Sequence, residues 1–208
     1  MPLCFIEEIG AVGSFGVWKI EEDESTLCSL RSLPPDEKEH MVALKNPKKR
    51  LHRLAYRVLL QSMLKVEFSI LYDQNGKPFL KNQSYNLSVS HSKDYAAVFI
   101  SPTHPVGIDV EQINERMPAL ASRFLSLNEL KTIDLQNIEL LHLYWGGKEC
   151  LYKMYSERKP LFEQHLSIEY VDIKTSNYTK AHIHMDDYKA THQLYFRKIG
   201  DYMLVYCY

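Results

Sequence analysis

Two carboxylates alternate with apolar residues in the segment Gly107-Ile108-Asp109-Val110-Glu111. In a strand, side chains two residues apart share a face, so Asp109 and Glu111 project together while Ile108 and Val110 enter a core. Two neighbouring carboxylates repel each other unless a cation lies between them, and ligand sets made only of oxygen favour a hard ion such as Mg²⁺. The segment therefore indicates either a divalent metal site or an exposed acidic end of a strand.

A second group of chemically active side chains lies in Trp145-Gly146-Gly147-Lys148-Glu149-Cys150-Leu151-Tyr152-Lys153, inside a predicted helix. Helical spacing places Trp145, Glu149 and Lys153 on one stripe. Glu149 could complete a metal site, and Lys148 and Lys153 could hold phosphate oxygens as point charges. The alternative is an ordinary Glu–Lys pair on the surface of a helix.

Further polar signals lie in the first half of the chain. The segment Ser88-Val89-Ser90-His91-Ser92 places a histidine where a strand ends, either as a phosphate or proton-transfer group or as a structural cap. Lys77-Pro78 follows a turn. Arg50, Arg53 and Arg57 recur at helical spacing and predict one basic stripe, which either grips phosphate through planar forks or is solvated.

The apolar pattern predicts both strands and helices. Residues 4–21 are expected to form short strands, a helix opens at residues 34–37, and Asn46 caps a further helix with Pro47 in its first position. The predicted apolar face of that helix consists of Leu51, Leu54, Ala55, Val58, Leu59 and Met63. Asn75-Gly76 predicts a hairpin turn. Further expected strands cover residues 67–72, 78–80, 87–91, 95–100, 106–111, 166–173, 181–185, 193–197 and 202–206, and further expected helices cover residues 119–124, 128–134 and 138–155.

One short internal echo suggests a duplication. Asp-Tyr-Ala-Ala-Val-Phe at residues 94–99 is followed 107 residues later by Asp-Tyr-Met-Leu-Val-Tyr at residues 201–206. Three identities in six are a weak signal when taken alone.

Composition narrows the class of protein. With 25 Lys+Arg against 26 Asp+Glu in 208 residues, the net charge of -1 makes neither nucleic acid nor a membrane the expected partner. No apolar run approaches the ~20 residues that span a bilayer, and the start does not resemble a signal peptide, so we expect a cytoplasmic protein. The four cysteines lack metal or redox spacing, and they are expected to be buried free thiols: Cys4, Cys28, Cys150 and Cys207.

Taken in order along the chain, these motifs resemble the 4'-phosphopantetheinyl transferase superfamily, and most of all its Sfp-like, pseudo-dimeric branch. That family shows a G-[IV]-D-[ILV]-E strand and a W-[ST]-x-K-E-[AS]-x-x-K helix, which stand here at residues 107–111 and 145–153. The resemblance runs from about residue 18 to residue 170. Two positions depart from it: Gly146 replaces a Ser or Thr and weakens the helix by ~1 kcal/mol relative to Ala, and Cys150 replaces a small residue.

The resemblance implies an α+β fold made of two similar α/β subdomains in one chain, a pseudo-dimer. Each subdomain would be a small, mainly antiparallel sheet packed on helices, with the first over residues 1–103 and the second over residues 104–208. The internal echo would then reflect two similar halves.

The resemblance also implies an activity: transfer of the 4'-phosphopantetheine arm of coenzyme A to a serine of an apo carrier protein, with Mg²⁺, releasing adenosine 3',5'-bisphosphate. Asp109, Glu111 and Glu149 would bind the metal, with Glu149 as candidate base. Lys148 and Lys153 would contact the diphosphate, with Lys153 stabilising the leaving group. The implied coenzyme A pocket contains Lys77, Pro78, Ser90, His91 (near the 3'-phosphate), Asp109, and Arg50 or Arg53 from the first long helix.

The expected partner is a small acidic acyl, polyketide or peptidyl carrier protein. This protein itself is expected to be a monomer. Candidate contacts lie between residues 116 and 131, where core packing is the alternative interpretation: Met117, Leu120, Arg123 and Phe124. Two other functions stay open. One is a coenzyme A or nucleotide-binding protein that transfers nothing, and the other is a different Mg²⁺-dependent phosphoryl enzyme, such as a nuclease or phosphatase.

Overall fold

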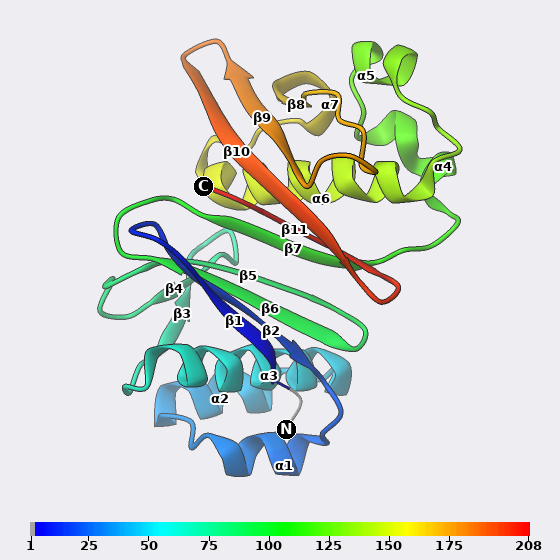
Figure 1. Cartoon of the computed structure of the whole chain (residues 1–208). Helices are drawn as coiled ribbons and strands as arrows, with labels where there is room; N and C mark the ends of the chain where they lie inside the picture. Colours follow the sequence, from blue (N-terminus) through cyan, green and yellow to red (C-terminus); the bar gives the residue numbers. More distant parts are fainter. Residues whose placement is uncertain (1–2) are drawn as a thin grey trace. The chain divides into compact units, whose positions relative to one another are not determined.

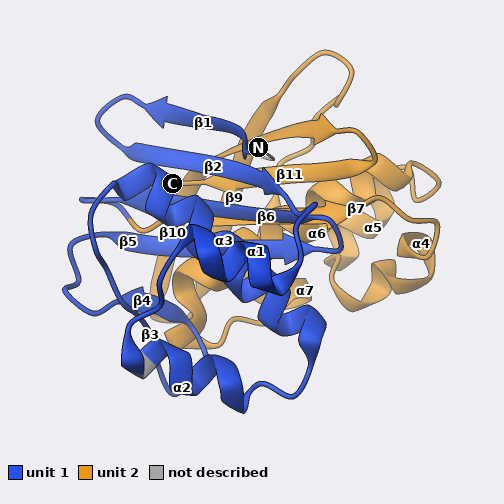
Figure 2. Cartoon of the chain, turned by 90° about the horizontal axis from the view of Figure 1, so that it is seen from below, with its two compact units in different colours: residues 1–104 blue, residues 105–208 orange. Residues whose placement is uncertain are grey.

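A computed structural model describes residues 3–208, apart from the side chain of Asp36. The chain divides into two compact units, residues 1–104 and residues 105–208 (Figure 2). Each unit has its own antiparallel sheet, its own long helix and its own apolar core. The predicted α+β class, with antiparallel sheets packed on helices, is therefore confirmed.

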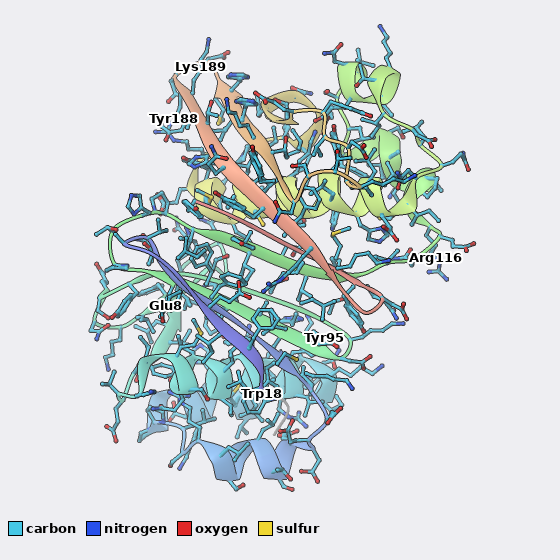
Figure 3. The ribbon with its side chains drawn as sticks, in the orientation of Figure 1. Glu8, Trp18, Tyr95, Arg116, Tyr188 and Lys189 are labelled. Carbon is cyan, nitrogen blue, oxygen red and sulfur yellow. The ribbon has the colours of Figure 1, made fainter. Side chains whose placement is uncertain are left out.

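The first unit contains a four-stranded sheet in the order β1-β2-β6-β5, in which all neighbours are antiparallel (Figure 1). Its helices and a small separate hairpin lie between β2 and β5 along the chain. The elements in order are β1 (Leu3–Ile9), β2 (Gly13–Lys19), α1 (Glu24–Leu30), α2 (Pro35–Ala43), α3 (Pro47–Leu64), β3 (Ile70–Tyr72), β4 (Pro78–Leu80), β5 (Asn86–Ser92) and β6 (Tyr95–Ser101). Trp18 and Tyr95 mark the ends of two paired strands, β2 and β6 (Figure 3).

Helix α3 forms as its cap and apolar spacing predict. The Asn46 side chain accepts hydrogen bonds from the backbone N–H groups of Lys48 and Lys49. Leu54, Ala55 and Leu59 are buried in the core of the first unit. The sequence pattern did not predict α1, a short helix that Asp23 caps by accepting from the Thr26 N–H at 2.8 Å.

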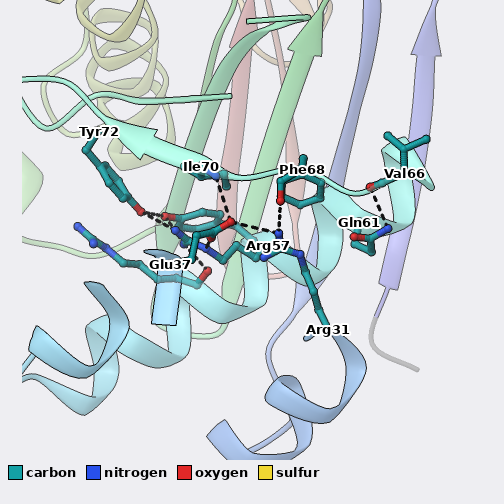
Figure 4. A network of polar contacts seen from close by, with 10 residues as sticks. Arg31, Glu37, Arg57, Gln61, Val66, Phe68, Ile70 and Tyr72 are labelled. Carbon is teal, nitrogen blue, oxygen red and sulfur yellow. Dashed lines mark hydrogen bonds and ion pairs between the residues drawn. The ribbon is translucent and has the colours of Figure 1, made fainter. Parts of the chain in front are cut away.

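A buried ion-pair network joins α2 to α3 and to β3 (Figure 4). Glu37, the third residue of α2, accepts from Arg57 on α3, from Arg31 Nη2 at 3.2 Å and from the Ile70 N–H at 3.1 Å. Arg57 is only 1% exposed. One carboxylate thus ties a short helix, a long helix and the following strand together.

This network corrects the prediction of one basic stripe on α3, because the three arginines have three different partners. Arg57 is buried against Glu37. The Nε of Arg50 donates to Glu24 at 3.0 Å, and the Arg53 guanidinium lies 4.3 Å from the centre of the Tyr72 ring. Whether an arginine on a helix is buried depends on which other elements pack against it, and the spacing of the arginines does not indicate this.

The second unit contains a five-stranded antiparallel sheet in the order β7-β11-β10-β9-β8. Tyr188 and Lys189 mark the start of β10, and Arg116 lies in the loop after β7 (Figure 3). The elements in order are β7 (Gly107–Gln112), α4 (Met117–Leu120), a 3-10 turn (Ala121–Arg123), α5 (Leu127–Thr132), α6 (Ile138–Tyr155), a 3-10 turn (Ser156–Arg158), α7 (Phe162–His165), β8 (Leu166–Ile168), β9 (Tyr178–Met185), β10 (Tyr188–Ile199) and β11 (Tyr202–Cys207).

Helix α6 has the predicted bounds, and Asn137 caps it by accepting from the Leu140 N–H at 3.0 Å. The strands around it differ from the prediction. The strand expected over residues 166–173 ends at Ile168, whereas β10 runs over 12 residues instead of the expected 193–197. Long antiparallel partners on both sides support the longer strand, which residue types alone did not indicate.

All four cysteines are free. Cys150 and Cys207 are buried as predicted, but Cys4 and Cys28 are exposed, so the prediction of burial is wrong for those two. Across residues 3–208, no helix combines the length and the apolar character needed to cross a bilayer.

Candidate functional site

Two glycines let helix α6 approach the sheet of the second unit closely. A Cβ on Gly107 would stand 2.4 Å from the carbonyl oxygen of Cys150, and one on Gly146 would stand 2.8 Å from a methyl group of Val205. The Gly146 Cβ would also come within 3.4 Å of Asp109 Oδ2. Gly146 was expected only to weaken the helix, but its lack of a side chain is what permits this contact between α6, β7 and β11.

The close approach brings Lys153 of α6 to Asp109 of β7. Lys153 Nζ donates to Asp109 Oδ1 at 2.8 Å and to the carbonyl oxygen of Ile108 at 2.7 Å. Asp109 is only 3% exposed. Burial disfavours the charged ammonium, but Asp109, Cys150 and Glu149 outweigh it and hold the pKa of Lys153 above its usual value.

Glu149 interacts electrostatically with both Asp109 and Lys153. Burial, together with the nearby Asp109 and Glu111 carboxylates, raises the pKa of Glu149 to about 7, and Lys153 opposes this shift. Strand alternation places Asp109 and Glu111 on one face of β7, with Ile108 and Val110 fully buried on the other. The two carboxylates of β7 therefore disfavour the charged form of Glu149, and Lys153 compensates only part of that effect.

Within residues 3–208, no three His, Cys, Asp or Glu side chains already stand as a preformed metal cage. The donor set nevertheless suits a hard divalent ion, because all three side chains are carboxylates and a cation would favour the charged form of Glu149, which burial and the other two carboxylates disfavour. Asp109, Glu111 and Glu149 are the residues that could hold it.

Lys148 is placed differently from the prediction that it contacts a diphosphate. Its Nζ donates to Glu129 Oε2 at 2.6 Å, to the Phe124 carbonyl at 2.7 Å and to the Phe162 carbonyl at 3.1 Å. An ammonium has three donors, so all of them are in use, and the side chain is fully buried. Lys148 is a structural residue here, and the neighbouring Lys153 is the lysine that reaches Asp109.

Glu129 completes this second buried network in a way that parallels Glu37. It is the third residue of α5, and its carboxylate also accepts from the Ser126 N–H at 2.7 Å and the Ile168 N–H at 2.9 Å. Lys148 and Arg57 both lie ten residues after the first residue of an 18-residue helix. Each unit thus ties its long helix to a preceding short helix and to a following strand through one carboxylate.

The predicted pocket residues of the first unit lie on β3–β4 and on β5. Lys77 closes the β3–β4 turn, where its N–H donates to Asp73 Oδ1 at 2.8 Å, and Pro78 pairs with Tyr72 across the hairpin. On β5, Ser90 pairs with Ala97 and His91 with Ala96. Successive residues of a strand point to opposite faces, so the Ser90 and His91 side chains lie on opposite faces of the sheet.

The structure distinguishes the two arginines that were candidates for contacting coenzyme A. Arg50 is held by the Glu24 carboxylate and donates from Nη1 to the Leu44 carbonyl at 2.6 Å. Arg53 stacks over Tyr72, the residue opposite Pro78 in the β3–β4 hairpin. Arg53 is therefore the arginine that lies beside the Lys77–Pro78 turn.

Sequence reasoning missed two residues of this region, Tyr72 and His52. Tyr72 contacts Arg53, and the ring of His52 on α3 stacks on that of His91 at 4.4 Å between centres. His52 directly precedes Arg53 on the predicted helix, but no spacing rule connects it with a strand 39 positions away.

The surface expected to meet a carrier protein is only partly available. Met117 is 5% exposed and Phe124 is fully buried, so both belong to the core of the second unit. Leu120 is 37% exposed and Arg123 is exposed. Met117 and Phe124 are thus core residues, whereas Leu120 and Arg123 are at the surface.

The chain is similar to several known proteins. Residues 105–207 match the family described as the 4'-phosphopantetheinyl transferase superfamily. The 4'-phosphopantetheinyl transferase AcpT of Escherichia coli K12 is 34% identical over 144 residues, which is 66% of this chain and 72% of AcpT. The 4'-phosphopantetheinyl transferase psf-1 of Bacillus pumilus is 34% identical over 85 residues, 38% of this chain and 36% of psf-1.

A Xenopus laevis protein named L-aminoadipate-semialdehyde dehydrogenase-phosphopantetheinyl transferase is 25% identical over 175 residues, 72% of this chain and 58% of that protein. The chain therefore spans less than two thirds of the length of the Xenopus and Bacillus relatives. The likeness to AcpT over most of both chains, together with the acidic β7 and the Lys153-bearing α6 of the matched region, shows that the chain belongs to the 4'-phosphopantetheinyl transferase superfamily.

Proposed function

We propose that this protein transfers the 4'-phosphopantetheine arm of coenzyme A to a serine of an apo carrier protein, with Mg²⁺, releasing adenosine 3',5'-bisphosphate. The observation that carries the proposal is the meeting of Asp109, Glu149 and Lys153 on β7 and α6, in a chain that belongs to this family. An acyl, polyketide or peptidyl carrier is the class of partner.

Asp109, Glu111 and Glu149 would hold the divalent ion. The ion would supply charge neutralisation at the diphosphate, where negative charge builds as the transferred group leaves. Its presence would also return Glu149 to the charged form, because a cation beside a carboxylate lowers its pKa.

The reaction breaks a phosphoanhydride bond of the diphosphate and forms a phosphoester bond to the carrier. The carrier's serine oxygen bonds to the phosphorus that carries the pantetheine arm, and the bond from that phosphorus to the bridging diphosphate oxygen breaks. The serine proton passes to a base, for which Glu149 is the candidate. Lys153 is the candidate for stabilising the leaving bisphosphate, since its ammonium already lies between Asp109 and the backbone of β7.

For coenzyme A itself, we propose contacts from Lys77, Pro78, Ser90, His91 and Arg53. Support for Arg53 over Arg50 comes from the ion pair that already engages Arg50 with Glu24. Lys148 is left out of this set, because its three donors are used inside the second unit.

We further propose that the two units arose by internal duplication and form the pseudo-dimer of this family. In each unit a strand is followed by an 18-residue helix and by a hairpin whose last strand pairs with the first. The echoed segments lie in equivalent strands, β6 and β11. The carbonyls of Asp94 and Asp201 both accept from an isoleucine N–H at the end of the neighbouring strand, at 2.6 and 2.8 Å.

The test is intact-mass analysis of an apo acyl carrier protein incubated with this protein, coenzyme A and Mg²⁺. Addition of the phosphopantetheine arm is expected with the natural chain, and its loss is expected in Asp109→Ala and Glu149→Ala. Glu139→Ala is a matched control, since Glu139 is a carboxylate on the same helix that pairs at the surface with Lys198. Equal activity in all three variants would contradict the proposed site.

The same assay separates the alternatives. Tight binding of coenzyme A without any mass increase on several apo carriers would indicate a binding protein. Release of phosphate from simple phosphate esters, abolished by Asp109→Ala, would indicate a different phosphoryl enzyme.

A further inference from the structure

Two imidazole rings stack in the first unit, one from helix α3 and one from strand β5. The centres of the His52 and His91 rings are 4.4 Å apart, and the ring planes differ by 20°. Offset stacking of this kind fixes the orientation of both rings relative to each other.

The alternation of β5 explains why the rings meet. Leu87 and Val89 belong to the core that α3 covers, and His91 is the next residue on the same face. The strand ends one residue later, at Ser92. His91 therefore lies on the same face as Leu87 and Val89 but beyond the core, and it is exposed. The adjacent position on α3 is that of His52.

A backbone contact holds the His52 ring in turn. His52 Nε2 lies 2.8 Å from the carbonyl oxygen of Lys93, in the turn between β5 and β6. A carbonyl only accepts, so Nε2 carries the hydrogen of this bond. Lys93 has φ 40°, and this left-handed turn directs its carbonyl toward α3. His52 is thus tied to the same hairpin whose histidine it stacks against.

We propose that His52 is the positioning residue of the phosphate site, holding the His91 ring in the orientation in which it meets the 3'-phosphate of coenzyme A. This inference rests on the proposed function, which places coenzyme A at His91. A ring ordered before the substrate arrives loses less freedom on binding, and ordering one side chain corresponds to about a three- to tenfold change in affinity.

A change at His52 is therefore expected to affect only the binding of the 3'-phosphate. An effect transmitted through His91 acts only on a substrate that has a 3'-phosphate, whereas general damage to the first unit acts on every substrate. 3'-Dephospho-coenzyme A, which lacks only that phosphate, separates the two.

The experiment measures kcat and KM for coenzyme A and for 3'-dephospho-coenzyme A, with an apo acyl carrier protein and Mg²⁺. His52→Ala is expected to raise KM for coenzyme A three- to tenfold, with kcat and the KM for the dephospho substrate unchanged. His52→Phe retains an aromatic face for stacking and is expected to recover most of the loss. The double variant with His91→Ala is expected to be no worse than His91→Ala alone, because residues that act as one unit are not additive.

His184→Ala is the matched control. His184 is also an exposed histidine stacked on a second one, His182, but on β9 of the second unit. It is expected to change neither KM. An equal rise in both KM values in His52→Ala, or full additivity with His91→Ala, would overturn the proposal.

A binding measurement distinguishes failure of this inference from failure of the proposed function. Calorimetry with adenosine 3',5'-bisphosphate and with adenosine 5'-monophosphate needs no transfer. Weaker binding of the bisphosphate alone in His52→Ala supports the inference even if no carrier is modified. Normal binding of both nucleotides in a variant of an active enzyme overturns it while the proposed function stands.

Discussion

Replacing Glu149 by glutamine removes a partly buried titratable group and keeps nearly the same shape. In the folded protein burial, together with Asp109 and Glu111, raises the pKa of Glu149 from 4.5 to about 7. A pKa difference of this size corresponds to roughly 3 kcal/mol, at about 1.4 kcal/mol per tenfold change in proton affinity.

The raised pKa determines how the contribution of Glu149 to stability changes with pH. Because the folded state holds the proton more tightly than the unfolded state, the contribution of Glu149 to stability is greatest below pH 4.5. It is lost as the pH rises through about 7, where the Glu149 carboxylate becomes charged. Glutamine stays neutral throughout, so the free energy of unfolding of Glu149→Gln relative to the natural chain is expected to rise by roughly 3 kcal/mol between pH 4.5 and pH 8.

The assay is urea unfolding followed by circular dichroism from pH 4.5 to pH 8, in EDTA so that no divalent ion is present. Glu139→Gln on the same helix, where the carboxylate makes an exposed ion pair, is expected to show little such trend. A flat difference for Glu149→Gln across this range would refute the reasoning, since it would mean that Glu149 is solvated and distant from the other carboxylates. Mg²⁺ at 100 times its Kd should then add about 2.7 kcal/mol to the natural chain and much less to the variant.

Three further changes test other parts of the second unit. Lys148→Met leaves the Glu129 carboxylate buried without its ion-pair partner, so the free energy of unfolding in urea is expected to fall by about 3–5 kcal/mol. Adding Glu129→Gln should recover part of this loss. A loss below 1 kcal/mol would contradict the buried pair. Ser126→Ala removes the side-chain acceptor of the α5 capping box, and about 1 kcal/mol should be lost in the same measurement. Arg123→Glu is expected to raise KM for an acidic carrier protein about tenfold while leaving KM for coenzyme A unchanged, and an equal effect of Lys131→Glu would show that general charge, not Arg123, matters.

Several local features could be predicted because neighbouring residues dictate them. The bounds of α6 follow from a continuous helical pattern, and the start of α3 follows from Asn46 and Pro47. The shared face of Asp109 and Glu111 follows from strand alternation alone. These inferences needed no knowledge of what lies beside each element.

Other features depend on which element covers which face. Lys148 and Lys153 were both expected to contact the diphosphate, yet the structure turns Lys148 into the core and Lys153 toward Asp109. Both lysines suit a helix equally well, and only the packing of α5 and α7 over one face of α6 separates them. The buried Arg57 was misassigned to a basic stripe for the same reason.

The sequence by itself determined the kinds of chemistry available, because motif spacing is a property of single elements: two carboxylates on one strand face, and a glutamate and a lysine on one helical stripe. Only the tertiary structure decided which charges meet. Gly107 and Gly146 allow α6 to close on β7, and this approach places Lys153 against Asp109 and raises the pKa of Glu149. Electrostatic interactions fall off with distance and grow with burial, and both quantities are set by packing between elements that are far apart in the chain.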